Sequence, residues 1–437
     1  MASDQKQPVG VGLLGAGTVG TALIELLAEP RAAAALEART GLRFEVVGAV
    51  VRDPSRPRSD GAWFDPAKLS TDAAALVADP RVEVVVELTG GGFDGEALRA
   101  AFAAGKPVVS ANKTLLAAKG RDLAAEAEAA GVDLMYEAAV AGAVPIVRTL
   151  RESLAGERVQ RVMGIVNGTT NFILSSMAEH GSAYADVLAE AQALGYAEAD
   201  PTADVEGHDA AQKAAVLAQL AFGADLTASD VATFGISSVT AEDVAAAARL
   251  GYAIKLLCVV SRAGQGAVAA KVAPTMVPLE HPLASVSGPY NAVFVEGVAA
   301  GPLMLYGQGA GGPATASAVL GDLVDVARRR GGSPMPAPVL DPDLKLQPFA
   351  DTESAFYLSV AVADRPGVLA QVATAFGEHG VSILSMEQVG KSDAASLVFV
   401  THETTEGQMA ATIAALEAID AVAAVGSVLR VVPGGVA

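Results

Sequence analysis

The chain has 437 residues, 51% hydrophobic and 18% charged, a composition typical of a folded protein with two or three domains. Its 30 Lys and Arg against 49 Asp and Glu give a net charge of -19, which argues against binding nucleic acid or anionic membranes. One cysteine, Cys258, excludes an intrachain disulfide, and its apolar surroundings predict a buried, inert thiol. With no membrane-length apolar stretch and no secretory signal in residues 1–8, we expect a cytoplasmic protein.

The first third alternates apolar runs with helical patterns. Valine-rich runs at 9–14, 44–51, 82–88, 107–110 and 132–136 predict buried strands, and 19–28 predicts a helix between two of them. Strand–helix alternation indicates an α/β fold with a doubly wound, Rossmann-type sheet over residues 1–144. A later glycine-rich segment leads into a helix through 319–330, and we expect residues of about 305–330 to pack back on this domain.

A glycine-rich loop follows the first predicted strand. It has the pattern G-x-G-x-x-G and consists of Gly15, Ala16, Gly17, Thr18, Val19 and Gly20. Between a strand and a helix this pattern indicates dinucleotide binding, because the glycines let the pyrophosphate approach the backbone and the helix N-terminus. The alternative is a purely structural glycine turn.

The end of the second predicted strand bears on the choice of dinucleotide. The strand reaches Val51 and Arg52, and an arginine there favours NADP because it can pair with the 2′-phosphate. The neighbouring Asp53 could instead bond the ribose of NAD, and either side chain could simply be solvated.

Polar residues also follow two other strands, at the edge where open α/β sheets bind ligands. They are Thr89, Gly90, Ser110, Asn112 and Lys113. Lys113 could polarise a carbonyl oxygen or give it a proton. The alternative is an exposed lysine at a helix start.

Residues 145–304 have a mixed α+β character and form a predicted catalytic and dimerisation domain. A helix at 145–154, a strand at 158–166 and helices at 169–180, 184–194 and 206–222 are expected. Carboxylates are concentrated between 195 and 213, where Asp209 and Lys213 lie four residues apart on an otherwise apolar helix face. This crowding favours an active site, and the alternative is an ordinary surface ion pair.

The C-terminal part begins with a predicted linker at 331–352, rich in Gly and Pro. Strands at 356–363, 383–389, 396–401 and 422–431 and helices at 369–379 and 406–418 then follow. Their βαββαβ order predicts a ferredoxin-like domain over 353–433.

Taken together, several motifs resemble those of homoserine dehydrogenase over about residues 1–330. They are NKT at 112–114, NGTTNFIL at 167–174, GYAEADP at 195–201 and GHDAAQK at 207–213. The tail, with DRPGVL at 364–369 and GVSI at 380–383, resembles an ACT domain. This combination implies the monofunctional, feedback-regulated form of the enzyme, which serves threonine, methionine and isoleucine biosynthesis.

The resemblance implies reversible, NAD(P)H-dependent reduction of aspartate 4-semialdehyde to homoserine. It assigns proton transfer to Lys213, a second lysine at the reacting oxygen to Lys113, an essential carboxylate to Asp209, and binding of the substrate ammonium to Glu198 and Asp204. Further substrate contacts are expected from Tyr196, Gly168 and Thr169, and further cofactor contacts from Gly309 and Gly311. It also implies a sodium or potassium ion held by backbone carbonyls of Glu137, Val140, Gly142 and Val144.

The ACT resemblance implies an amino-acid effector, threonine by hypothesis, and a homo-oligomer that is a dimer or a tetramer. Ser382 stands where asparagine is common at the effector-binding edge, which leaves the effector open. If the tail is modular, truncation after about residue 350 should leave an active enzyme that threonine does not inhibit. Two alternatives are a Rossmann dehydrogenase for another amino-acid-derived carbonyl and a non-enzymatic sensor of dinucleotide and amino acid.

Overall fold

The computed structural model describes residues 7–56, 65–90, 93–264, 266–330, 332–391 and 394–432. The chain divides into two compact units. The first contains Met1–Gly156, Ala215–Ala228 and Leu305–Asp341, and the second contains Glu157–Ala214, Ser229–Met304 and Pro342–Ala437. No helix among the described residues combines the length and apolarity that crossing a membrane requires.

The first unit contains a six-stranded parallel sheet in the order β3-β2-β1-β4-β5-β6. Its strands are β1 (Val9–Leu14), β2 (Phe44–Val50), β3 (Leu69–Ser70), β4 (Val84–Glu87), β5 (Val108–Ser110) and β6 (Leu134–Met135). The strand order changes direction between β1 and β4, and ligands bind at such a point outside the carboxyl ends of the strands. The predicted doubly wound sheet is therefore confirmed.

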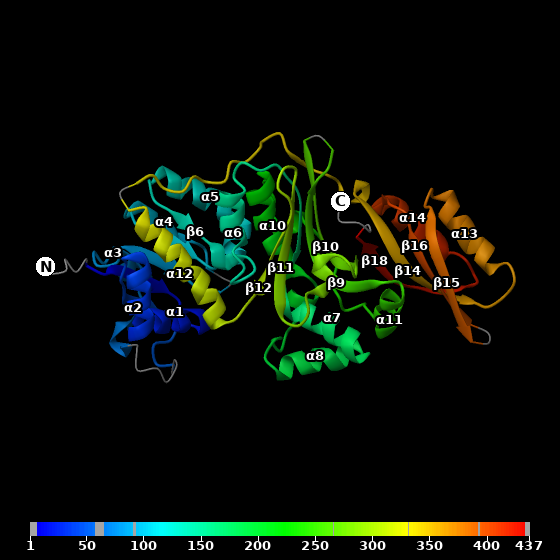
Figure 1. Cartoon of the computed structure of the whole chain (residues 1–437), viewed down its shortest axis with the longest axis horizontal. Helices are drawn as coiled ribbons and strands as arrows, with labels where there is room; N and C mark the ends of the chain where they lie inside the picture. The colour runs from blue at the N-terminus through cyan, green and yellow to red at the C-terminus, as the bar shows by residue number, and fades with distance from the viewer. Residues whose placement is uncertain are drawn as a thin grey trace. The chain divides into compact units, whose positions relative to one another are not determined.

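Helices cover both faces of this sheet. They are α1 (Thr18–Ala28), α2 (Pro30–Thr40), α3 (Ala73–Ala78), α4 (Glu96–Ala103), α5 (Lys113–Ala129) and α12 (Gly312–Arg328), with short 3₁₀ turns at Pro66–Lys68 and Glu137–Ala139. Helix α12 packs against α1 (Figure 1), and its Val319 and Leu323 share one buried core with Leu23 of α1. Burial of each such side chain contributes roughly 1.5–3 kcal/mol.

Two local predictions differ from the structure. Helix α2 was not expected, because Leu36 is its only buried residue and no apolar face marks it in the sequence. It begins instead through capping, since Glu29 accepts a hydrogen bond from Ala32 N at 2.5 Å and Pro30 occupies the first turn. The single helix expected at 145–154 is a short α-helical turn, α6 (Ile146–Arg148), followed by a π-helical turn over Thr149–Ser153.

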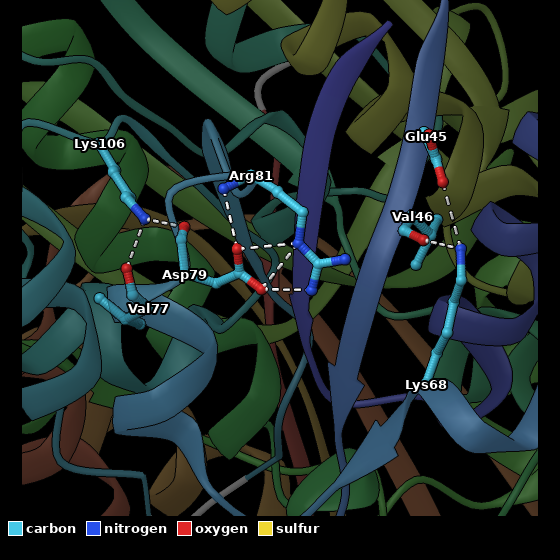
Figure 2. A network of polar contacts seen from close by, with 7 residues as sticks. All are labelled: Glu45, Val46, Lys68, Val77, Asp79, Arg81 and Lys106. Atoms are coloured by element: carbon cyan, nitrogen blue, oxygen red, sulfur yellow. Dashed lines mark hydrogen bonds and ion pairs between the residues drawn. The ribbon is translucent and has the colours of Figure 1, made fainter.

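Polar contacts join the loops at the amino ends of the first sheet (Figure 2). Lys106 Nζ donates to Val77 O at 2.5 Å and to Asp79 O at 2.7 Å, and Arg81 binds the Asp79 carboxylate. The hydrogen bonds from Arg81 lower the pKa of Asp79 to about 2. Lys68 makes a similar contact with Val46 O at 2.7 Å. Lys68, Asp79, Arg81 and Lys106 all precede the next strand along the chain, so the network lies at the edge opposite the glycine-rich loop and is structural.

The second unit contains a mixed sheet in the order β12-β11-β7-β9-β10-β18-β14-β16-β15. Its strands are β7 (Val159–Ile165), β8 (Ala232–Thr233), β9 (Tyr252–Arg262), β10 (Ala267–Pro278), β11 (Tyr290–Gly297), β12 (Gly301–Gln308), β13 (Lys345–Leu346), β14 (Glu353–Ala363), β15 (Ile383–Lys391), β16 (Ala394–Thr401), β17 (Thr404–Thr405) and β18 (Val422–Val431). The helices are α7 (Gly168–His180), α8 (Tyr184–Ala193), α9 (Thr202–Val205), α10 (His208–Phe222), α11 (Ala241–Arg249), α13 (Val368–Glu378) and α14 (Glu406–Glu417), with 3₁₀ turns at Ala228–Asp230, Pro282–Ser285 and Phe349–Asp351.

The central feature of this sheet is the long antiparallel hairpin of β9 and β10, in which Tyr252 pairs with Pro278 and Arg262 with Val268. Cys258 lies on β9 and is fully buried, as predicted. Burial raises the pKa of its thiol to about 12, which keeps it protonated.

The C-terminal segment has the predicted βαββαβ order, with strands arranged β18-β14-β16-β15. Alternate residues of β14 from Phe356 to Val362 pack with α13 and α14 in one core. This domain is not joined only through its linker. Strand β18 pairs in parallel with β10, with Thr275 opposite Arg430, so the two sheets are continuous. The expected linker also contains β13, which pairs with the other end of β10.

Candidate active site

The glycine-rich loop after β1 has the geometry that a pyrophosphate requires. Gly15 has φ 103°, and a Cβ there would lie 2.9 Å from Leu88 O. At Gly20 a Cβ would lie 2.5 Å from Gly15 O, whereas Gly17 faces open space. Helix α1 begins with Gly17 as its N-cap and no side-chain capping bond. The loop therefore leaves helix N–H groups open to an anion, and it fits a dinucleotide.

A buried carboxylate organises the next two strand ends. Glu87, at the end of β4, is 0% exposed and accepts hydrogen bonds from Thr89 N at 2.8 Å and from the Thr89 hydroxyl. It also accepts from Ser110 Oγ at 2.6 Å and from Asn112 Nδ2 at 3.3 Å. Burial raises the pKa of Glu87, while these hydrogen bonds oppose the rise. Thr89, Ser110 and Asn112, three residues predicted to contact the cofactor, thus all donate hydrogen bonds to the Glu87 carboxylate.

Asn112 also fixes the start of helix α5. Its Oδ1 accepts from Leu115 N at 3.1 Å, so Lys113 occupies the first helical position and is half-buried. Gly90, on the neighbouring loop, has open space where a side chain would lie. The backbone at this edge is therefore accessible to a flat ligand.

The end of β2 is followed by a cationic side chain, Arg52, and by a carboxylate, Asp53, that already accepts hydrogen bonds. Arg52 is exposed, and Val51 N donates to Ser70 O at 2.8 Å. The Asp53 carboxylate accepts from Ser55 N at 2.9 Å and from Ser55 Oγ at 2.6 Å. Asp53 is thus held in a local turn, while Arg52 extends toward solvent.

The segment proposed for the monovalent cation is a buried, tightly turned loop. Ala141 (φ 57°) is the only non-glycine with positive φ in the described chain, and Gly142 (φ 58°) follows it. A Cβ at Gly142 would lie 2.4 Å from Gly309 O. The Glu137 carboxylate accepts from Val147 N at 2.9 Å and Arg148 N at 2.7 Å. Val140 and Val144 are both fully buried, so the four predicted positions lie in one buried turn.

Asp209 and Lys213 form a buried ion pair in the second unit. Lys213 Nζ donates to Asp209 Oδ2 at 2.7 Å and to Val166 O at 2.5 Å. The side chain of Lys213 is only 10% exposed and that of Asp209 only 7%, so the alternative interpretation, an ordinary surface ion pair, does not apply. Removing one partner from a buried pair costs on the order of 3–5 kcal/mol, which marks the pair as a fixed element of the fold.

Asn167 links this pair to a second carboxylate. Its Nδ2 donates to Asp209 Oδ2 at 3.0 Å and to Asp204 Oδ1 at 2.7 Å. Its Oδ1 caps helix α7 by accepting from Thr170 N at 2.9 Å. One amide therefore positions the helix start, the ion pair and Asp204 together.

The remaining predicted substrate residues lie around the start of α7. Thr169 Oγ1 donates to Tyr196 O at 2.6 Å, and the Tyr196 ring lies 4.9 Å from the ring of Phe172. Gly168 admits no side chain, because a Cβ would lie 2.7 Å from Pro289 O. Glu198 follows Tyr196 by two residues and is exposed, and Gln192 Nε2 donates to the Glu198 carbonyl at 3.0 Å.

Reasoning from the sequence missed two organising residues. Glu87 was treated as the end of an apolar strand, although a carboxylate closing a valine run is itself a signal of a buried polar role. Asn167 was part of a quoted motif but received no role, although an Asn before a helical pattern is a typical N-cap.

Comparison with known proteins is consistent across the chain. Residues 15–137 match the family model for the homoserine dehydrogenase NAD binding domain, residues 145–324 that for homoserine dehydrogenase, and residues 356–421 that for the ACT domain. The homoserine dehydrogenase of Corynebacterium glutamicum is 50% identical over 428 residues, which cover 97% of this chain and 95% of that protein. That of Pseudomonas aeruginosa is 43% identical, with 97% and 98% covered.

Solved structures give the same result. The crystal structure of a homoserine dehydrogenase from Thiobacillus denitrificans has a TM-score of 0.90 at 41% identity, covering 98% of this chain and 99% of that one. A hyperthermophilic archaeal homoserine dehydrogenase in complex with NADPH has a TM-score of 0.61 at 26% identity, covering 74% and 98%.

Proposed function

The chain belongs to the homoserine dehydrogenase family and is an NAD(P)-dependent oxidoreductase, and we propose that it reversibly reduces L-aspartate 4-semialdehyde to L-homoserine. The observation that carries this proposal is the buried Asp209–Lys213 pair, joined by Asn167 to Asp204. A substrate with an ammonium group, a carboxylate and a reacting carbonyl requires both signs of charge in one protected site. This cluster supplies them.

Lys213 is the proposed proton donor. The reduced dinucleotide, when bound, supplies the hydride for the aldehyde carbon. Lys213 gives a proton to the aldehyde oxygen, which becomes the hydroxyl of homoserine, and takes a proton back in the reverse reaction. Asp209 accepts a hydrogen bond from Lys213 Nζ at 2.7 Å and so orients it. Lys113 is the proposed second cation for the developing oxyanion.

Substrate recognition follows from the surrounding carboxylates. Asp204 and Glu198 are proposed to bind the ammonium group, with Asp204 fixed through Asn167. Tyr196, Gly168 and Thr169 are proposed to complete the substrate contacts.

The dinucleotide is proposed to bind along the carboxyl edge of the first sheet. Residues 15–20 hold the pyrophosphate. The nicotinamide end is held by Gly90 and by the three residues that hydrogen-bond to Glu87 (Thr89, Ser110 and Asn112), with Gly309 and Gly311 in the chain after β12. Exposed Arg52 favours NADP, because Asp53 is engaged by Ser55. The turn containing Glu137, Val140, Gly142 and Val144 is proposed to bind sodium or potassium through its carbonyls.

The domain organisation is proposed as 1–144 with about 305–330 for the dinucleotide, 145–304 for substrate and oligomerisation, 331–352 as linker, and 353–433 for regulation. The ACT domain is proposed to bind threonine and inhibit a cytoplasmic homo-oligomer, a dimer or tetramer, in threonine, methionine and isoleucine biosynthesis.

The test is the oxidation of NADPH with aspartate semialdehyde, followed by absorbance and repeated with NADH and with added threonine. Turnover establishes the reaction, the ratio of the two cofactors tests Arg52, and loss of rate with threonine assigns the regulatory ligand. Folded protein that binds dinucleotide without turnover would instead support a sensor of dinucleotide and amino acid. Turnover that survives Lys213→Ala and Asp209→Ala would support a dehydrogenase for a different carbonyl.

A further inference from the structure

A buried ion cluster joins the ACT domain to the β9–β10 hairpin. Arg430 of β18 donates to both carboxylate oxygens of Glu406, at 3.0 and 2.7 Å. Lys271 of β10 lies 3.6 Å from Glu406 and also donates to the Ser354 hydroxyl. Arg430 and Glu406 have side chains 9% and 5% exposed, and that of Lys271 is 13% exposed. Bidentate geometry under such burial fixes the guanidinium plane.

The guanidinium of Arg430 lies over an aromatic ring of residues 145–304, the domain proposed for the substrate. Its central carbon is 4.1 Å from the centroid of Phe234, within the range of a cation–π contact. The centroid of the Phe349 ring lies 5.4 Å from that of the Phe234 ring, and Phe349 precedes β14. Phe234 therefore contacts both the ACT domain, through Arg430, and the segment that leads into that domain, through Phe349.

The chain around Phe234 in turn supports the residues proposed for catalysis. Phe234 N donates to Val272 O at 2.8 Å, which continues the pairing of β8 with β10. Ile236 N donates to Val205 O at 2.8 Å. At Gly235 a Cβ would lie 2.6 Å from Val205 O, and at Gly207 a Cβ would lie 3.0 Å from the Thr233 side chain.

Segment 232–236 is thus packed without spare room against residues 205–207. Val205 is the last residue of α9, which also contains Asp204, and Glu206 and Gly207 form the turn to α10, which carries Asp209 and Lys213. Phe234 is 37% exposed, but the backbone on its C-terminal side is fixed to this turn by the hydrogen bond from Ile236 N to Val205 O and by the close approach of Gly235. A displacement of the Phe234 backbone would therefore move the turn.

We propose that Phe234 and Arg430 are positioning residues, through which the ACT domain sets the placement of Asp204 and of the Asp209–Lys213 pair. The role of the catalytic pair rests on the proposed function. The ACT domain is then a structural part of the substrate site as well as a regulatory one. Removing it would expose Lys271 and the face of the Phe234 ring that Arg430 covers, so truncation after about residue 350 lowers activity instead of leaving it intact.

The test compares Phe234→Leu and Arg430→Lys with Phe234→Tyr and Arg249→Lys. Phe234→Leu keeps an apolar side chain but removes the ring, and Arg430→Lys keeps the charge but removes the bidentate contact. Phe234→Tyr retains the ring and should behave as wild type. Arg249→Lys is the matched control, because Arg249 pairs with Glu387 of the ACT domain across an exposed contact of 3.4 Å that does not involve segment 232–236.

We expect Phe234→Leu and Arg430→Lys to raise KM for homoserine by about fivefold or more, the lower end of typical coupling between sites. KM for the dinucleotide should stay unchanged, because the glycine-rich loop belongs to the other unit. A merely structural role would lower thermal stability without this split. Wild-type KM values in both variants, or an equal rise in Arg249→Lys, would overturn the proposal.

Hydrogen exchange of the unmodified enzyme gives a second, independent measurement that no failure of a variant to fold can obscure. If threonine acts through the contact between Arg430 and Phe234, its addition should change amide protection in both segment 232–236 and segment 202–213. Protection that changes in the ACT domain alone would overturn the coupling. An enzyme that threonine neither binds nor inhibits would refute the proposed effector, while the KM measurements would still decide the positioning role.

Discussion

Replacing Asp322 by Asn should remove a pH dependence from the stability of the first unit. Asp322 is 1% exposed on α12, where its carboxylate accepts from Glu137 N at 2.8 Å and from Arg148 Nη2 at 3.3 Å. Burial raises the pKa of Asp322 from 3.8 to about 7 despite both contacts. The folded protein therefore binds this proton at pH values where the unfolded chain has released it.

The sign and size of the effect follow from linkage. The stabilisation from holding the proton is present below the unfolded pKa and is lost as pH rises through the folded pKa. Each pH unit between these two values changes the free energy of unfolding by about 1.4 kcal/mol. From pH 5 to pH 8, wild type should thus lose roughly 3 kcal/mol relative to Asp322→Asn, which has no proton to release.

Hydrogen exchange in peptides from α12 and β1, measured at pH 5 and pH 8, reports the opening free energy of this unit by itself. Asp325→Asn is the matched control, because Asp325 binds the same Arg148 at 2.7 Å but is 19% exposed. The difference between wild type and Asp322→Asn should change between the two pH values by roughly 3 kcal/mol. The difference between wild type and the control should change by less, because the control keeps the buried Asp322 carboxyl. Equal differences at both pH values would refute the conclusion that burial keeps Asp322 protonated.

Three further substitutions test the proposed site. Lys213→Ala should lower kcat by about 10²–10⁴-fold, the usual contribution of a general acid, with dinucleotide binding retained; steady-state rates and a binding titration check this. Glu87→Gln should raise KM for the dinucleotide by about fivefold, because the amide replaces one of the two acceptor oxygens by a donor and so loses a hydrogen bond worth roughly 1 kcal/mol; an unchanged KM would show that this network does not serve the cofactor. Arg52→Ala should raise KM for NADPH by about tenfold or more and leave that for NADH unchanged, since only the 2′-phosphate offers a charge-assisted contact; an equal effect on both cofactors would contradict the NADP assignment.

Local patterns predicted most elements of the chain. The valine-rich runs become buried strands, because a strand covered on both faces needs a continuous apolar sequence. The spacing of Asp209 and Lys213 placed them on one helix face, as their 2.7 Å contact requires. Elements whose signals are not periodic were missed, as α2 shows, since its start depends on Glu29 and Pro30 and not on an apolar face.

What the sequence by itself determined is what short-range chemistry specifies: the strands and helices, the glycine-rich loop, the ferredoxin-like order of the tail and the motifs that indicate the family. Tertiary structure alone decided that Glu87 gathers Thr89, Ser110 and Asn112, and that Arg430 lies over Phe234 nearly 200 residues earlier. The physical reason is that periodicity and capping act over a few residues. Contacts between distant residues depend on strand order and on which buried charges find partners, and no local pattern encodes either.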